Sequence, residues 1–140
     1  MRLCAKHFLR GKEFFMTENE LSKIIVNCCF NIHKAYGPGL FESVYEELLV
    51  YELKKEGLSI ERQKGIGLVH EELKLELGFR ADVIVENNII VEIKSIEAIA
   101  PIHHKQLLTY LKLSGLKLGL LVNFNEALIK DGIHRLVNNL

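Results

Sequence analysis

The spacing of apolar residues predicts two helices in the first part of the chain. Thr17 and Glu20 form the T-x-x-E pattern of a helix-capping box. After them, apolar residues recur at the intervals of one helix face, at Leu21, Ile24, Ile25, Cys28, Ile32 and Tyr36. Gly37-Pro38-Gly39 ends this helix, because proline cannot continue a helix and glycine accepts the turn. A second helix is predicted from about residue 40 to residue 56, with Gly57 after its last turn.

The middle of the chain has the composition and alternation of β-strands. Strands are predicted at residues 60–70, 73–77, 80–85 and 89–94, with turns at 71–72 and 86–88. In the second of these strands, leucine alternates with charged residues, which is typical of a strand with one buried face.

The last third of the chain alternates helix and strand. A third helix is predicted at about 101–113, opened by Pro101 and closed by Ser114-Gly115. The nearly continuous apolar run at 117–124 indicates a strand covered on both faces. Residues 133–137 fit either a short strand or a helical turn.

This order of elements predicts an α/β domain in which helices pack around a mixed central sheet. The length, 140 residues, suits one domain. Residues 1–15 are interpreted as an N-terminal extension that need not be ordered, ahead of a domain at 16–140. The alternative for this basic and apolar segment is an arm that binds a membrane or nucleic acid.

Composition and charge narrow the functional classes. Lysine and arginine number 18, as do aspartate and glutamate, so the strongly basic footprint of many nucleic-acid-binding proteins is missing. A nucleic acid would therefore be bound at a local site, through a divalent cation. No apolar run approaches the ~20 residues that span a bilayer, so no membrane partner is expected. The three cysteines lack the spacing of a zinc site and suit the reducing cytoplasm.

Candidate chemistry lies on the predicted hairpin. If residues 86–88 form its turn, Asp82 falls opposite Glu92, and Lys94 shares a face with Glu92. Facing carboxylates destabilise a sheet unless a hard cation such as Mg²⁺ or Mn²⁺ takes their oxygens as ligands. A lysine beside them can polarise water or stabilise charge on a phosphate. The alternative is a solvated Glu92–Lys94 ion pair.

Two helices add polar residues to this list. Glu42 lies on the apolar stripe of the second helix, where a carboxylate costs free energy unless it is paired or ligates a metal. The spacing fits equally well a carboxylate in the first turn that complements the helix dipole. On the third helix, Gln106 and Tyr110 share a face. His103 and His104 are neighbours in the sequence and face different ways, so a shared metal is not expected of them.

These motifs occur in the order found in a known family. The run Gly39-Leu40-Phe41-Glu42-Ser43-Val44-Tyr45 resembles the motif that names the GxxExxY protein family, within the PD-(D/E)XK nuclease superfamily. The later blocks are similar as well, and the resemblance covers about residues 20–137: Arg80-Ala81-Asp82, Glu92-Ile93-Lys94, Gln106 to Tyr110, and 118–124. One departure is Ala81, where the superfamily name has proline.

The resemblance implies a restriction-endonuclease-like α-β-β-β-α-β core with a metal site. Asp82, Glu92 and the carbonyl of Ile93 would hold Mg²⁺, with Mn²⁺ as a substitute, and Glu42 would add to the site. Lys94 would act on the attacking water. Gln106 and Tyr110 would support the site and contact the nucleic acid, together with Arg80 of the same block as Asp82.

The expected function is hydrolysis of phosphodiester bonds in DNA, or else in RNA. The alternative is a catalytically silent domain of the same fold that serves as a binding or assembly module. Neutral charge favours the alternative, and the complete set of Asp82, Glu92, Lys94 and Glu42 favours the enzyme. A homodimer or a separate protein partner is a further expectation, because a small neutral domain has little surface with which to hold a nucleic acid.

Overall fold

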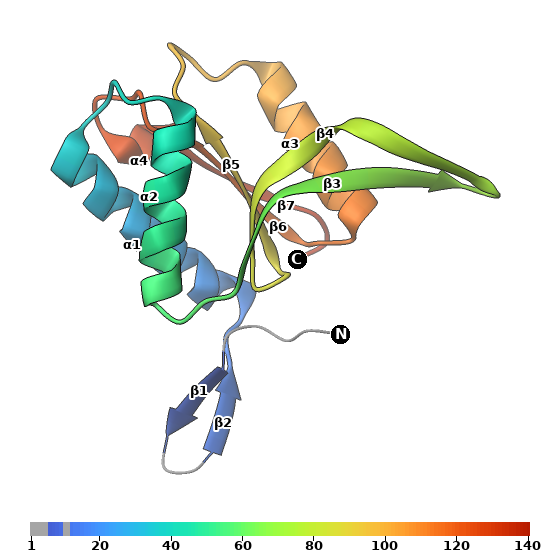
Figure 1. Ribbon diagram of the computed structural model, residues 1–140, viewed down its shortest axis with the longest axis horizontal. Coiled ribbons are helices and arrows are strands. Elements are labelled where there is room, and N and C mark those ends of the chain that lie inside the picture. The colour runs from blue at the N-terminus through green and yellow to red at the C-terminus, as the bar shows by residue number, and fades with distance from the viewer. Residues whose placement is uncertain (1–5, 10–11) are drawn as a thin grey trace.

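The structure is a computed structural model that describes residues 6–9 and 12–140, without the side chains of 6–9, 12–15 and 77–79 (Figure 1). Its helices are α1 Glu18–Tyr36, α2 Glu42–Lys55, α3 Pro101–Ser114 and the single turn α4 Ile129–Gly132. Its strands are β1 Lys6–Leu9, β2 Lys12–Phe15, β3 Ile60–His70, β4 Leu73–Val85, β5 Ile89–Lys94, β6 Leu118–Asn123 and β7 Ile133–Val137. In the described part of the chain, no helix is long and apolar enough to cross a membrane.

The ends of α1 and α3 follow from local chemistry. The predicted capping box is present, since Glu20 N donates to Thr17 Oγ1 at 3.1 Å and Thr17 N donates to Glu20 Oε2 at 3.2 Å. At the other end of α1, Gly37 has a positive φ of 66°, which side chains disfavour. Helix α3 ends at Gly115, which adopts the left-handed conformation.

The central sheet has five strands in the order β3-β4-β5-β6-β7. β5 and β6 run parallel and are joined through α3, whereas the other neighbours run antiparallel. The predicted α-β-β-β-α-β core and its mixed sheet are thus confirmed. The ambiguous segment 133–137 is a strand, paired with β6 and preceded by α4.

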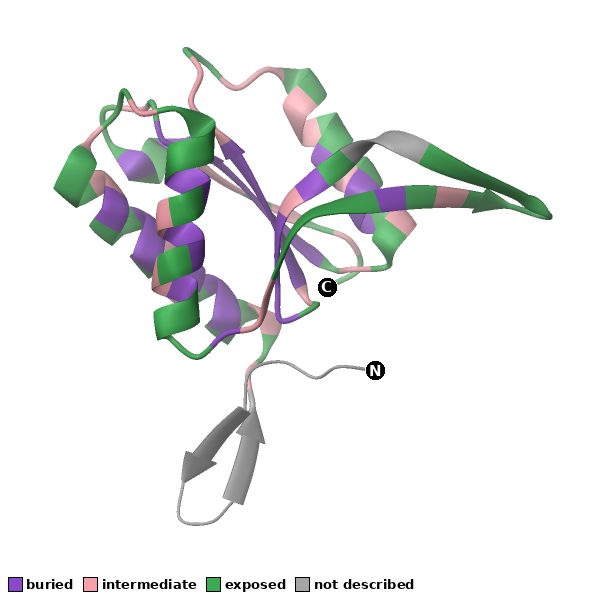
Figure 2. Ribbon diagram, in the orientation of Figure 1, coloured by how far each residue is buried: buried purple, intermediate pink, exposed green. Residues whose placement is uncertain are grey.

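Helices cover the sheet on both faces (Figures 1 and 2). The larger core joins α1 and α2 to one face, where Tyr45 and Phe124 stack with ring centroids 4.3 Å apart. The smaller core joins α3 to the opposite face through Leu107 and Leu111, which contact a cluster that includes Ile90. Residues that alternate along β5 therefore point to different cores, and this alternation decides what lies beside each polar residue of the site.

β3 and β4 extend beyond the other strands as a two-stranded ribbon (Figure 1). A register shift between Gly65 and Gly67 separates the base of this ribbon from its outer part, residues 67–76, which we call the arm. Half-burial was predicted for the strand at 73–77, yet Leu73 and Leu75 are exposed. That prediction is wrong for the single chain, because no described segment covers this part of the ribbon.

Among the described strands, β1 and β2 pair with each other and form a hairpin outside the five-stranded sheet. Residues 1–5 and 10–11 lie outside the described part of the chain, as do the side chains of this hairpin. The interpretation of residues 1–15 as a separate extension therefore stays a prediction.

Candidate active site

The β4–β5 hairpin has the register predicted from its turn, with Val83 opposite Val91. Asp82 and Glu92 occupy the next position, and each carboxylate reaches the other strand. Ile93 N donates to Asp82 Oδ2 at 2.9 Å, and Asp82 N donates to Glu92 Oε1 at 3.3 Å. The sequence thus places two carboxylates face to face at the point where the backbone ladder of the hairpin stops.

The electrostatics of this pair depend on burial. Glu92 is only 7% exposed, because it lies on the face of β5 that α3 covers. Burial raises the pKa of Glu92 to about 9, the facing charge of Asp82 contributes to the rise, and the Lys94 ammonium opposes it. Without a further cation, Glu92 therefore binds a proton at neutral pH and shares a hydrogen bond with Asp82.

Helix α3 carries two of the predicted site residues, one of them buried and the other exposed. Tyr110 is 7% exposed, and burial raises its pKa, with further increases from Glu92 and Asp82. The Tyr110 hydroxyl is therefore within the electrostatic reach of both carboxylates. Gln106, one turn earlier on α3, is exposed, and Lys94 is half-buried at the end of β5. The structure thus brings Tyr110 and Lys94 to the predicted site, and it places Gln106 on the same helix closer to solvent.

Glu42 opens α2 and lies at the same edge of the sheet. Its Oε1 accepts a hydrogen bond from Ser95 N at 3.2 Å, directly after β5. Glu42 is exposed, in contrast to the interior position expected from the apolar stripe, because the first turn of α2 extends past the packed core. A hollow of about 230 Å³ is lined by Glu42, Ser43, Glu46, Gln63, Asp82 and Ile93. Glu42 and Asp82 therefore face the same space.

A polar cluster behind this hollow was not predicted. Glu46, 8% exposed, accepts from Arg62 Nη2 at 2.8 Å and from Gln63 Nε2 at 2.7 Å. Gln63 Nε2 also donates to Asp82 Oδ1 at 3.3 Å, so one amide bridges Glu46 and Asp82. The backbone of Gln63 is left-handed, with φ 49°, and its carbonyl accepts from Arg80 Nη1 at 3.2 Å. Arg80, which is itself exposed, is thus anchored to the backbone of this left-handed residue.

One signal in the sequence could have identified Glu46. It follows Glu42 by one helical turn and lies between Tyr45 and Leu49 on the buried side of α2. A carboxylate at such a position requires a partner. Gln63 gave no comparable signal, because only the folded backbone shows its left-handed conformation.

The tyrosine of the Gly39–Tyr45 motif holds a turn. Tyr45 Oη donates to Gly37 O at 2.5 Å and accepts from Leu40 N at 3.2 Å. Leu40 O in turn accepts from Ser95 Oγ at 2.7 Å, which ties this turn to the end of β5. The motif therefore fixes the position of Glu42 relative to the strand that carries Glu92 and Lys94.

The oxygen donors of the site are of the kind that a hard divalent cation binds. Among the described residues, no three Asp, Glu, His or Cys side chains are grouped around one point. Mg²⁺ commonly uses one or two carboxylates and retains several waters, so Asp82 and Glu92 satisfy its minimum. A cation would also remove the cost of two facing acids in a buried position. These two residues therefore fit such an ion, with Glu42 and the Ile93 carbonyl as further candidates, because Glu42 and Ile93 line the hollow that Asp82 also lines.

The neighbouring histidines have other roles. His103 Nδ1 accepts from Ala100 N at 2.8 Å at the start of α3. The ring of His104 meets that of His134 edge-on, with centroids 4.9 Å apart. As expected from their spacing, His103 and His104 have different partners.

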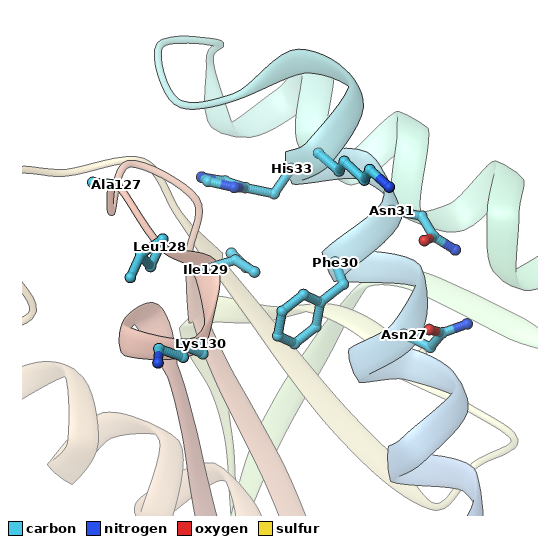
Figure 3. A pocket seen from close by; sticks show the side chains of 9 residues that line it. Asn27, Phe30, Asn31, His33, Ala127, Leu128, Ile129 and Lys130 are labelled. Atoms are coloured by element: carbon cyan, nitrogen blue, oxygen red, sulfur yellow. The ribbon is translucent and has the colours of Figure 1, made fainter.

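A second hollow, of about 400 Å³, lies between α1 and the segment that leads into α4 (Figure 3). Phe30 and His33 project into it from α1, opposite Leu128 and Ile129. His33 Nε2 lies 2.8 Å from Glu126 O and bridges the two sides. Among the described residues, no carboxylate lines this hollow, so it lacks the chemistry found at Asp82 and Glu92.

Comparison with known proteins assigns the class. Residues 19–136 match the family model described as the PD-(D/E)XK nuclease superfamily. The chain therefore belongs to this superfamily, and its fold is the restriction-endonuclease-like one that the family resemblance implied. No curated protein and no solved structure matches the chain.

Proposed function

We propose that this protein is a Mg²⁺-dependent nuclease that hydrolyses phosphodiester bonds in DNA, as a member of the GxxExxY family. Membership of a nuclease superfamily supports nuclease-type function in general. The observation that carries the specific proposal is the pair Asp82 and Glu92, whose carboxylates face each other in a buried position with Lys94 beside them. A sheet gains no stability from this arrangement, whereas phosphoryl transfer uses each of these groups.

Each residue has a distinct task in this proposal. Asp82 and Glu92 hold the cation, with Glu42 and the Ile93 carbonyl as supporting ligands. Mg²⁺ bound there would lower the pKa of a water molecule and would supply positive charge against the negative charge that builds up on the phosphate. The Lys94 ammonium orients the water for in-line attack on phosphorus and stabilises the same negative charge. Gln106, Tyr110 and Arg80 contact the nucleic-acid strand, and the exposed position of Gln106 and Arg80 suits this task.

The experiment is a cleavage assay with Mn²⁺ or Mg²⁺ on single- and double-stranded DNA and RNA, linear and circular. Slow cleavage is expected for the wild type, and Lys94→Ala is expected to abolish it while metal binding and melting temperature are retained. Lys112→Ala, an exposed lysine on α3, is the matched control and should cleave normally. Cleavage that survives Lys94→Ala would show that a contaminant or another site is responsible.

A second candidate function is a catalytically silent binding module. The neutral charge of the chain favours it, because strong binding to phosphates normally requires excess positive charge. The two functions differ in cation binding, measured by calorimetry. An absence of both cleavage and measurable Mg²⁺ or Mn²⁺ binding would establish the binding module and reject the nuclease.

A further inference from the structure

The arm, residues 67–76, presents an apolar face that the described part of the chain leaves open. In the paired register, Leu68 lies opposite Leu75, and His70 lies opposite Leu73. Opposed residues of antiparallel strands share a face, so these leucines form one apolar side of the ribbon. Leu73 is 53% and Leu75 is 42% exposed. In this part of β4, leucines thus alternate with charged residues as in a strand with one buried face, yet Leu73 and Leu75 are exposed.

The backbone of the arm has open edges as well. Within the described part of the chain, β5 pairs with β4 only at residues 83–85, so in the arm β4 is bonded to β3 alone. No described strand pairs with the N–H and C=O groups on the other edge of β4, and such groups are a template for another strand. A two-stranded ribbon is marginally stable in water and becomes stable when further strands are added. The arm therefore has both a side and an edge suited to a partner that is itself a β-strand.

The charges on β4 indicate which strand fits. Lys74 and Glu76 lie on the face opposite the leucines and flank Leu75 on either side. If β4 pairs antiparallel with a second copy of itself about an axis at Leu75, Lys74 of each copy falls opposite Glu76 of the other. Two opposite-charge pairs form by symmetry, and the two Leu75 side chains become neighbours. The sequence around Leu75 is thus complementary to itself.

From this complementarity we infer that the arm is a docking surface for a second copy of this chain, with β4 pairing antiparallel about Leu75. The two ribbons then form a four-stranded sheet. Because β4 runs from the tip of the arm toward the body of the domain, the two bodies lie at opposite ends of this sheet, so neither obstructs the other. The inference does not depend on the proposed nuclease function.

Charge reversal tests this register. Lys74→Glu sets Glu against Glu76 of the other copy, and Glu76→Lys sets Lys against Lys74. Each single variant is expected to weaken dimerisation by about tenfold, whereas the double variant Lys74→Glu/Glu76→Lys should restore it. The measurement is sedimentation velocity over a wide range of protein concentration. Lys23→Glu makes the same change of charge at an exposed position on α1 and should leave the dimer unchanged.

Crosslinking provides a second readout that does not depend on charge. Leu75→Cys, made in a Cys4→Ser background, should form a disulfide-linked dimer on mild oxidation, because the axis places the two residues side by side. The remaining Cys28 and Cys29 are buried and serve as the internal control. A wild type that is monomeric at every concentration overturns the proposal. A dimer whose stability is unchanged by both single charge reversals also overturns the proposal. An arm that binds only added DNA overturns it as well.

Discussion

At the scale of single residues, the site places a buried acid beside a carboxylate that accepts several hydrogen bonds. Asp82 accepts from Ile93 N and Gln63 Nε2, whereas burial raises the pKa of Glu92 to about 9 and keeps a proton on it. A cation would replace that proton. Metal binding should therefore release protons, and this release makes the affinity dependent on pH.

Asp82→Asn should remove cation binding before it damages the fold. Asparagine keeps one oxygen that can accept from Ile93 N and lacks the charge that a hard cation requires. In the wild type, Mn²⁺ at a hundredfold excess over its Kd should stabilise the fold by about 2.7 kcal/mol, seen as a rise in melting temperature. The variant should show no such rise. Asp131→Asn, an exposed position, is the control, and an equal rise in the Asp82 variant would place the ion elsewhere.

Glu92→Gln should alter how the stability of the metal-free protein depends on pH. The folded pKa of about 9 lies above the ordinary value, so the folded state holds a proton that the unfolded state has released. The contribution of Glu92 to the free energy of unfolding is fully present below about pH 4.3 and is lost as the pH rises through about 9. Glutamine does not titrate, so it causes no such loss. Near pH 9, the free energy of unfolding of the variant should therefore rise relative to that of the wild type by about 1–3 kcal/mol. Thermal melts in EDTA across this range measure the difference, and parallel pH curves would contradict it.

At the scale of elements, the turn between α1 and α2 connects the motif to the site. Tyr45→Phe removes the hydrogen bonds to Gly37 O and Leu40 N while the ring can still stack on Phe124. We expect a loss of about 1–3 kcal/mol of stability, since two backbone groups lose their partner. Tyr51→Phe on the exposed side of the same helix should cost almost nothing. Urea denaturation of the pair separates the effects, and equal losses would show that the turn does not depend on Tyr45.

The helices and strands were predictable where the spacing of apolar residues fits only one type of element. The bounds of α1, β3, β5 and α3 follow from the apolar spacing and from local end signals. The hairpin turn fixed the register that brings Asp82 to Glu92, so the centre of the site was accessible from the sequence. The cluster of Glu46, Arg62 and Gln63 was not, since it depends on a left-handed residue and on contacts between α2 and β3.

Exposure was the other property that periodicity left undetermined. The alternation in residues 73–77 shows which side of the strand is apolar and does not show what covers it. The same pattern occurs in a strand whose apolar side is covered by its own domain and in a strand whose apolar side is covered by another chain. Glu42 is a related case. The apolar stripe shows which side of α2 faces the core, but it does not show how far along the helix the core extends, and Glu42 is exposed.

At the scale of the whole molecule, helices pack on both faces of the central sheet. The arm extends beyond this sheet, and the candidate site lies where β4 and β5 stop pairing. The two cores contain the buried apolar residues of α1, α2, α3 and the sheet, and the β1–β2 hairpin pairs with none of these strands. The stability of the domain should therefore reside in residues 16–140. Phe8, Phe14 and Phe15 could contradict this expectation by packing on the core, but their side chains lie outside the described part of the chain.

Deletion of residues 1–15 should leave the melting temperature within about two degrees of the full chain, which corresponds to less than about 1 kcal/mol for a domain of this size. The capping box of Thr17 and Glu20 gives α1 a beginning that requires no preceding residue, because both members lie inside the shortened chain. Differential scanning calorimetry of the two forms measures the difference. Thr17→Ala in the shortened chain is the positive control and should lower stability by about 1 kcal/mol. A deletion that costs several times this amount would show that the hairpin packs on the domain and belongs to its core.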